Sequence, residues 1–197
     1  LALPAIAIGF FVRFFDNDKV KSWGEVLLGF GILFLGLSIM SESVKELRGS
    51  EIIINFMCRF KADSMLTTLM VVITGTIITM VIQSSSAVMA MTMTLAVNGL
   101  IDFYTASALI LGENIGTTIT ANLAAVGSTS EARRTARVHM LFNIFGVILV
   151  MLIFKNIFIP FIDWIIPGDP FSPSLDVRSK VIADHMAAFH TSFNIIN

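Results

Sequence analysis

A glutamine and three consecutive serines form the most polar uncharged cluster of the sequence: Gln83, Ser84, Ser85 and Ser86. The cluster lies near the middle of residues 64–101, a stretch without a charged side chain. Serine hydroxyls, a glutamine carbonyl and free main-chain carbonyls are hard, uncharged oxygen ligands. Such oxygens suit a small alkali cation that is bound and then released, so the cluster predicts a cation site.

A second polar cluster, within GENIGTT at residues 112–118, repeats this chemistry with one amide and two hydroxyls, those of Asn114, Thr117 and Thr118. Two glycines, an asparagine and paired threonines in an apolar segment predict a break in a transmembrane helix. Where half-helices meet, their N-termini direct unpaired N–H groups toward an anion, and the unwound segments offer oxygens to Na⁺. One site can then bind Na⁺ and an oxyanion together, as in secondary transporters.

Glu113 is the only acidic residue between Asp102 and Glu131. A carboxylate inside a membrane span is by default a functional hypothesis, because an unpaired charge there is costly. We therefore treat Glu113 as a candidate cation or proton site. The alternative is a residue at the rim of the membrane.

Packing is the alternative role for the hydroxyl groups, and the sequence offers little support for catalysis. Serine and threonine hydrogen-bond between membrane helices, each bond contributing about 0.6–2 kcal/mol. The serines lack a Gly-x-Ser-x-Gly turn, and neither His139 nor His190 has an acidic partner beside it in the sequence. Cysteine and histidine spacings typical of transition-metal sites are also missing. We predict a protein that is not an enzyme, needs no cofactor and uses Na⁺ as its coupling ion.

The elements that position these clusters are transmembrane helices. Hydrophobic residues make up 55% of the 197-residue sequence and charged residues 14%, against about 25% charged residues in soluble domains. Residues 26–40 and 138–154, with their flanks, are each long enough for one span, since about 20 residues cross the hydrocarbon layer. We expect an all-α integral membrane protein, a helical bundle with four or five spans. The net charge of −1 argues against a nucleic-acid partner.

Residues 64–101 are too long for a single span, because one continuous helix of that length would measure about 57 Å. The chain must therefore turn or break, and the glutamine–serine cluster lies almost at the midpoint. Two half-helices that enter the membrane and return to the same side predict a re-entrant helical hairpin with the cluster at its tip. Such a tip needs protein around it or a water-filled cavity.

The remaining segments divide the chain into two predicted regions of one membrane domain, residues 1–63 and residues 64–197. The first contains scaffold helices and, at residues 50–63, an amphipathic helix that lies in the membrane interface or connects two helices beneath other protein. The second contains the two polar clusters, a proline-interrupted region and a last helix that begins at residue 184.

Two short sequences repeat one pattern: HMLFN at residues 139–143 and HTSFN at residues 190–194 share His, Phe and Asn at the same spacing. We interpret this as a faint trace of duplication. Their histidines are expected to cap or hydrogen-bond the starts of helices, and a proton relay is the alternative.

Three motifs in this order, QSSSA, LGENIGTTITA and ARRTARVHMLFN, resemble those of the bacterial members of the type II sodium-dependent phosphate cotransporter family. The similarity is strongest over residues 76–143. That family carries two inverted repeats, each with its own QSSS hairpin, whereas this chain shows one QSSS and flanking sequences similar to those of the second repeat. The resemblance therefore implies one half of an inverted-repeat transporter, and we expect the chain to be a piece of a longer protein.

Carried over by motif, the resemblance implies sodium-coupled symport of inorganic phosphate across a membrane, which we expect to be the bacterial inner (plasma) membrane. The implied phosphate-binding residues are Gln83, Ser84, Ser85, Ser86, Thr117 and Thr118. The implied sodium-binding residues are Gln83, Ser86, Asn114, Thr117 and Thr118. Expected partners are phosphate, Na⁺, the lipid bilayer, the missing first repeat or a second copy of the chain, and a PhoU-like cytosolic domain. The alternatives are a Na⁺-coupled transporter of another oxyanion or a carboxylate, and a non-transporting membrane scaffold or signalling subunit.

Overall fold

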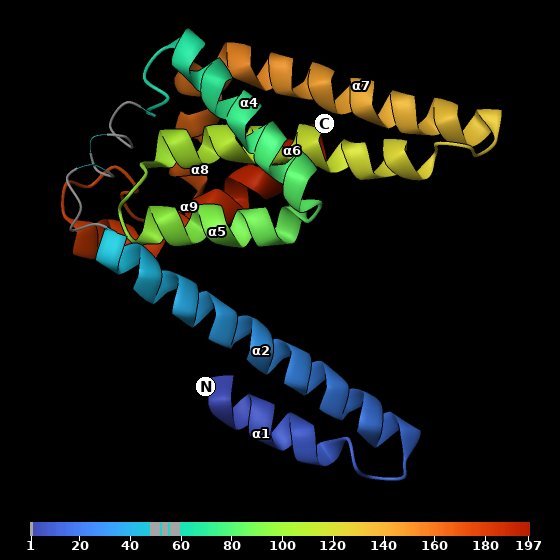
Figure 1. The fold of residues 1–197 in the computed structure, drawn as a ribbon. Helices are drawn as coiled ribbons and strands as arrows, with labels where there is room; N and C mark the ends of the chain where they lie inside the picture. Colours follow the sequence, from blue (N-terminus) through green and yellow to red (C-terminus); the bar gives the residue numbers. More distant parts are fainter. Residues whose placement is uncertain (1, 48–51, 53–54, 56–59) are drawn as a thin grey trace. The chain divides into compact units, whose positions relative to one another are not determined.

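A computed structural model describes residues 2–47, 52, 55 and 60–197, and all regular structure in these residues is helical (Figure 1). The chain divides into two compact units, Leu1–Leu47 and Arg48–Asn197. Most of the predicted amphipathic helix at residues 50–63 lies outside the described residues.

The first unit is a pair of helices, α1 (Ala2–Val12) and α2 (Asp18–Leu47), joined by a short turn. Glycines let the two helices approach closely, as is common in membrane proteins. A Cβ added at Gly9 would lie 2.5 Å from the main chain of α2, and one at Gly31 would lie 2.7 Å from the main chain of α1. Any larger residue at either position would push the pair apart.

The second unit holds the predicted site. Its helical segments, shown in Figure 1, are α4 (Met65–Ile82), α5 (Ser85–Val97), α6 (Phe103–Ala124), α7 (Ser130–Ile153), the π-helical turn η1 (Phe154–Phe158), α8 (Ile159–Ile165) and α9 (Leu175–Ile196). The proline-rich segment after α8 interrupts the helices as predicted. Helix α9 begins well before the predicted residue 184, because charged side chains such as Asp176 and Lys180 are tolerated on the exposed side of a helix.

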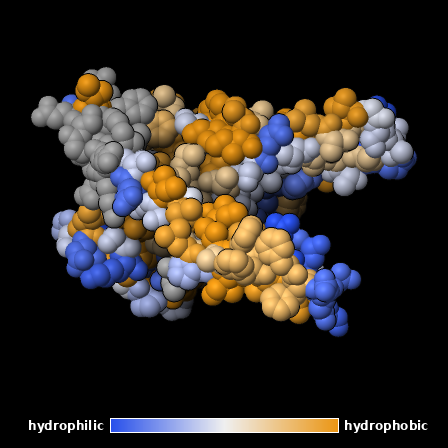
Figure 2. Space-filling model, turned by 60° about the horizontal axis from the view of Figure 1, so that its bottom comes forward, coloured by the Kyte–Doolittle hydropathy of each residue, from blue (hydrophilic) through white to orange (hydrophobic). Residues whose placement is uncertain are grey.

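Three helical segments are long and apolar enough to cross a membrane: Asp18–Ser43, Met65–Ile82 and Ser130–Ile165. Among the described residues, this is fewer than the four or five spans predicted. Large apolar side chains project from these segments, with Val81 of α4 77% exposed and Val138 of α7 63% exposed, and Figure 2 shows broad hydrophobic patches on the surface. Apolar surface of this extent requires a lipid environment. The protein is an integral membrane protein.

Helix α6 lies at the centre of the second unit. Its first half is buried and packs against α4, where a Cβ added at Gly75 would lie 2.5 Å from the Leu109 carbonyl oxygen of α6. Helix α9 contributes further side chains that are 0% exposed: Ile182, Met186, Phe189 and Phe193. This close packing fixes the positions of the polar residues in the second half of α6.

We expect Gly112→Ala to destabilise the second unit by about 1–3 kcal/mol, the usual cost of overpacking a core. A Cβ at Gly112 would lie 2.1 Å from the Val72 carbonyl oxygen of α4, and a main-chain atom cannot rotate away as a flexible side chain can. The thermal unfolding midpoint of the full-length protein in detergent measures the effect.

Gly29→Ala is the matched control, because no described atom lies within 4 Å of a Cβ added at Gly29 of α2. Alanine has the higher helix propensity, so this substitution should be neutral or stabilising. Equal unfolding midpoints for the two variants would contradict the packing role of Gly112.

Candidate functional site

Gln83 and Ser84 form a break between α4 and α5. Gln83 ends α4 in the left-handed conformation, with φ 56° and ψ 25°, and its N–H donates to the Thr79 carbonyl oxygen at 2.7 Å. Ser84 begins α5, and its Oγ accepts a hydrogen bond from the Ala87 N–H at 3.3 Å. The predicted interruption of residues 64–101 is therefore confirmed at the predicted place, whereas its re-entry into a membrane stays a prediction.

Substitutions at Gln83 can distinguish the contribution of its left-handed main chain from that of its side-chain amide. A left-handed conformation costs a residue other than glycine about 1–2 kcal/mol, so Gln83→Gly should fold at least as stably as the natural protein. A β-branched residue fits this conformation poorly, and Gln83→Val should lower the thermal unfolding midpoint in detergent. A midpoint for Gln83→Gly below that of Gln83→Val would contradict this. Weaker ion binding by Gln83→Gly at unchanged stability would assign a ligand role to the amide.

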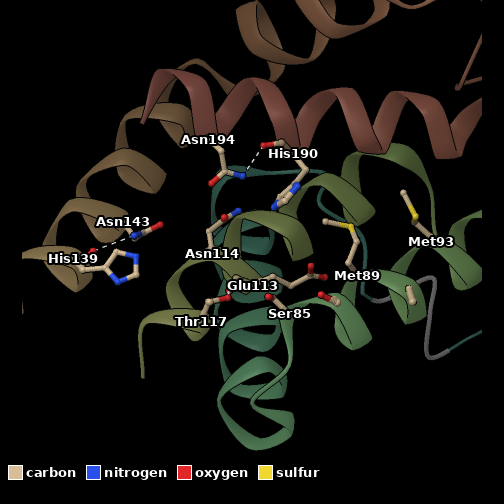
Figure 3. A pocket seen from close by; sticks show the side chains of 12 residues that line it. Ser85, Met89, Met93, Glu113, Asn114, Thr117, His139, Asn143, His190 and Asn194 are labelled. Carbon is tan, nitrogen blue, oxygen red and sulfur yellow. Dashed lines mark hydrogen bonds between the residues drawn. The ribbon is translucent and has the colours of Figure 1, made fainter. Parts of the chain in front are cut away.

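Side chains from α5, α6, α7 and α9 surround a cavity of about 610 Å³ (Figure 3). Its volume falls within the range of about 300–1,000 Å³ typical of small-molecule sites. Ser85 and Ser86 of the first predicted cluster and Asn114 and Thr117 of the second line it, and so does Glu113. Helix α5 also contributes an apolar edge formed by Met89, Ala90 and Met93. The two clusters, distant in sequence, therefore meet at one cavity.

Ser85 and Ser86 belong to the first turn of α5, so they lie where main-chain N–H groups have no partner within the helix. The helix dipole places its positive end at the same point. Hydroxyl groups and a helix N-terminus together can donate hydrogen bonds to an oxyanion in the cavity.

Helix α6 runs without interruption from Phe103 to Ala124, so the predicted break at residues 114–118 is wrong. The polar side chains of this segment bond to carbonyl groups of their own helix. The Asn114 Nδ2 donates to the preceding turn at 2.8 Å, and the Thr117 Oγ1 does so at 2.7 Å. Such bonds let amide and hydroxyl residues remain in a regular helix.

The glycines of this segment permit close packing against α4 and do not break the helix. A Cβ at Gly116 would lie 2.7 Å from the Thr76 carbonyl oxygen, and the Thr76 hydroxyl donates to the Gly112 carbonyl oxygen at 3.1 Å. A glycine that faces a neighbouring helix and a glycine that ends a helix look alike in the sequence, because only the tertiary contacts distinguish them.

Glu113 is 2% exposed and is one of the residues that line the cavity. Its Oε1 accepts a hydrogen bond from the Thr92 hydroxyl of α5 at 2.7 Å. Its Oε2 is buried and has no hydrogen-bond partner among the described residues. Glu113 is therefore part of the protein interior, not a residue at an exposed rim.

Three residues of the predicted site do not line the cavity. Gln83 and Ser84 are exposed at the break between α4 and α5. Thr118 is 1% exposed, and its hydroxyl donates to the Ile115 carbonyl oxygen at 2.7 Å within α6. Ser85, Ser86, Asn114 and Thr117 are thus the hydroxyl and amide residues of the prediction that a bound ion can reach in this structure.

Two asparagine–histidine pairs also line the cavity: His139 and Asn143 on α7, and His190 and Asn194 on α9 (Figure 3). In each pair the asparagine Nδ2 donates to the carbonyl oxygen of the histidine, at 3.0 Å for Asn143 and 2.8 Å for Asn194. This bond turns the amide nitrogen toward its own helix and the amide oxygen away from it. The sequence contained the signal, since these are the repeated His and Asn positions, but nothing in it showed that α7 and α9 converge on one cavity.

The ionisable side chains that line the cavity are a carboxyl group and two imidazoles. In the part of the chain that the structure describes, the lining includes one glutamate and two histidines but no lysine or arginine. No group of three or more His, Cys, Asp or Glu residues within that part is placed to hold a metal ion. Within the described residues, the sources of positive charge near the cavity are the α5 N-terminus and the two histidines.

The sequence matches the family model described as Na⁺/Pi-cotransporter over residues 1–42 and 52–161. It is 34% identical to the uncharacterized protein YqeW of Bacillus subtilis over 67% of this chain and 42% of that protein. It is 25% identical to YjbB of Salmonella typhimurium, a provisionally assigned inorganic phosphate export protein, over 91% of this chain and 30% of that protein. It is 40% identical to the mouse sodium-dependent phosphate transport protein 2C over 42% of this chain and 14% of that protein. The chain spans less than half the length of each of these relatives, and no solved structure matches it.

Proposed function

Because the chain belongs to the Na⁺/Pi-cotransporter family, we propose that it forms part of a transporter that carries inorganic phosphate together with Na⁺ across the membrane. The observation that supports this most is the meeting of two uncharged polar clusters, from α5 and α6, at one cavity of a membrane protein. A bacterial inner membrane is consistent with the bacterial relatives. Transport, rather than catalysis, is the activity that we assign.

Phosphate, in this proposal, binds at the first turn of α5. The hydroxyl groups of Ser85 and Ser86 donate hydrogen bonds to its oxygens, and the unpaired N–H groups of the helix N-terminus add to them. Gln83 and Ser84 hold the break that exposes this N-terminus, and they reach the anion directly only if the break rearranges.

Sodium binds between the phosphate and α6. The Asn114 amide oxygen, the Thr117 hydroxyl oxygen and the Ser86 hydroxyl oxygen supply uncharged ligands. Thr118 lies on the buried side of α6, where its hydroxyl donates a hydrogen bond to the Ile115 carbonyl oxygen. A cation about 4 Å from the phosphate contributes about 4 kcal/mol per pair of unit charges at an effective dielectric constant of 20. This attraction makes each ligand raise the affinity for the other, which is the basis of coupled transport.

A complete pathway needs protein from outside this chain. The relatives are more than twice as long as the segment that matches. We propose that a first repeat or a second copy closes the cavity, and that the turn between α4 and α5 re-enters the membrane to meet it. A PhoU-like cytosolic domain is a further proposed partner.

The direction of phosphate movement has two candidates. Na⁺ symport into the cell follows from the normal inward Na⁺ gradient, and the provisional export assignment of YjbB favours outward movement. Both use the same ligands, so the geometry of the cavity serves either direction.

Full-length protein in proteoliposomes tests the proposal. An inward Na⁺ gradient should drive accumulation of ³²P-phosphate, and replacement of Na⁺ with K⁺ should abolish it. Equal accumulation in K⁺ would overturn Na⁺ coupling. Competition with arsenate, sulfate and succinate separates phosphate from other anions, because arsenate matches phosphate in shape and in protonation, whereas sulfate carries no proton at neutral pH and succinate is not tetrahedral. A reversed gradient applied to preloaded vesicles then compares efflux with uptake.

A further inference from the structure

Another pocket of the second unit lies at the corner where α6 ends and α7 begins (Figure 1). It has a volume of about 140 Å³, and Arg133 and Arg137 of α7 line it together with Asn122, Ala125 and Val126 from the end of α6 and the turn after it. Among the described residues, none lines both this pocket and the cavity at the α5 N-terminus. The function proposed above leaves this corner pocket unassigned.

An asparagine fixes the shape of the corner pocket. The Asn122 Nδ2 donates to the Thr118 carbonyl oxygen of α6 at 2.9 Å and to the Ala136 carbonyl oxygen of α7 at 3.2 Å, so one amide group joins the two helices. Arg133 and Arg137 are four residues apart, and their side chains therefore project from the same side of α7. The two guanidinium groups share the pocket.

The arginines at this corner have no acidic partner. Glu131 is the only acidic residue between Glu113 and Asp163, whereas α7 carries three arginines within its first two turns or so, at positions 133, 134 and 137. None of the three forms an ion pair with a described residue. The corner therefore carries a net positive charge that an anion from its surroundings can balance.

The length of the apolar part of α7 places the corner pocket at the depth of the lipid headgroups. Residues 138–153 follow Arg137 directly and contain no acidic residue, lysine or arginine. As a helix they measure about 24 Å, close to the hydrocarbon thickness of about 30 Å. Arg133 and Arg137 lie within about 8 Å of the end of this apolar segment, and the headgroup region extends about 5–8 Å beyond the hydrocarbon on each side.

Exposed apolar side chains border the corner pocket. Val126 lines it and is 76% exposed. Val138, directly after Arg137, and Leu141, one turn further along α7, are exposed as well. A free phosphate ion gains nothing from these side chains, whereas a phospholipid covers them with its acyl chains while its phosphate group contacts the arginines. The surroundings of the pocket favour a lipid over a free ion.

We propose that the corner pocket binds the phosphate group of an anionic phospholipid. Arg133 and Arg137 each present a planar set of N–H donors, which can bind two phosphate oxygens with parallel hydrogen bonds. The positive end of the α7 dipole adds to this attraction. The acyl chains lie along Val138 and Leu141, so the bound lipid holds the α6–α7 corner at the membrane surface. This site goes beyond the proposed function and does not depend on it.

Photolabelling of the full-length protein in nanodiscs tests the proposal. The probe is phosphatidylglycerol with a photoreactive acyl chain, used at a low mole fraction in phosphatidylcholine, and peptide mass spectrometry measures labelling of the peptide that spans residues 122–141. Arg137→Gln should lower this labelling by about tenfold or more, the effect of losing a hydrogen bond to a charged group. Arg133→Gln, Arg137→Gln together should lower it by about 100-fold or more.

Arg134→Gln is the matched control, because it removes the same charge from the adjacent residue, which does not line the pocket. Its effect should not exceed about fivefold, the contribution of general attraction between one arginine and an anionic surface. Glutamine has a high helix propensity and both pocket arginines are exposed, so the fold should be kept. Labelled peptides from other helices of the same sample provide the internal reference.

Unchanged labelling of residues 122–141 in the double variant overturns the proposal. So does an equal loss in Arg134→Gln and Arg137→Gln, which would reduce the corner to a charged surface without a site. An excess of inorganic phosphate distinguishes the two sources of a phosphate group. Labelling of the natural protein should be insensitive to it, and displacement of the lipid probe by inorganic phosphate would overturn the lipid assignment in favour of a free phosphate site.

Discussion

The double variant Ser85→Ala, Ser86→Ala is expected to lower Na⁺-driven phosphate uptake at low phosphate concentration by more than about 100-fold. Both hydroxyls lie in the first turn of α5 and line the cavity. A hydrogen bond to a charged group contributes about 1.5–3 kcal/mol, so the loss of two should cost about 3–6 kcal/mol of phosphate binding. Initial rates of ³²P-phosphate uptake into proteoliposomes, over a range of phosphate concentrations, measure this effect.

Stability is not expected to change, because neither hydroxyl caps α5. That role belongs to Ser84, whose Oγ accepts the Ala87 N–H. Ser128→Ala is the control, since Ser128 is exposed in the turn between α6 and α7. An unchanged uptake rate in the double variant would remove the α5 N-terminus from the phosphate site.

Asn114→Leu is expected to raise the Na⁺ concentration for half-maximal uptake by about 10-fold to 100-fold, from the loss of one ligand to a charged ion. The Asn114 Nδ2 donates to the Ile110 carbonyl oxygen, which leaves the amide oxygen as the atom available to a cation. Leucine has the same branched side-chain skeleton and a higher helix propensity, so α6 should keep its structure. Uptake measured against Na⁺ concentration, at saturating phosphate, isolates this effect.

Asn156→Leu provides the matched control, because Asn156 is exposed in η1 and does not line the cavity. If Asn114→Leu changed the phosphate dependence and not the Na⁺ dependence, Asn114 would belong to the anion site. If it changed neither, the α6 cluster would have a packing role only.

The break between α4 and α5 was predictable from the sequence alone. Length excluded a single span, and the polar midpoint of residues 64–101 marked the place where the chain turns. The observed ends at Ile82 and Ser85 enclose that midpoint. This success rests on two local quantities, the number of uncharged residues and the position of the polar ones, neither of which needs tertiary information.

The continuous course of α6 was not predictable by the same reasoning. Glycine and threonine weaken a helix in water, but here Gly112 and Gly116 contact α4 and Thr117 bonds to its own helix. Packing against α4 therefore offsets the low helix propensity of the glycines in α6. A pattern that indicates a break in one context therefore indicates close packing in another.

The contribution of Asn143 and Asn194 was missed for a related reason. Their repeated spacing was visible, yet the two residues lie on separate helices with the proline-rich segment between them. Only the convergence of α7 and α9 on the cavity turns a repeated pattern into a shared wall. Sequence reasoning finds residues with suitable chemistry more readily than it finds which of them meet.

If the chain is part of a phosphate transporter as proposed, the composition of the cavity wall also favours an order in which the two ions bind. A chamber that offers a carboxyl group and no lysine or arginine within the described residues repels a lone oxyanion. Besides the α5 N-terminus and the two histidines, an incoming cation is the source of positive charge, so we expect Na⁺ to bind before phosphate. Loss of the cation on the other side of the membrane would leave the anion without its counter-charge, so in the proposed transporter the ion gradient would govern both the binding and the release of phosphate.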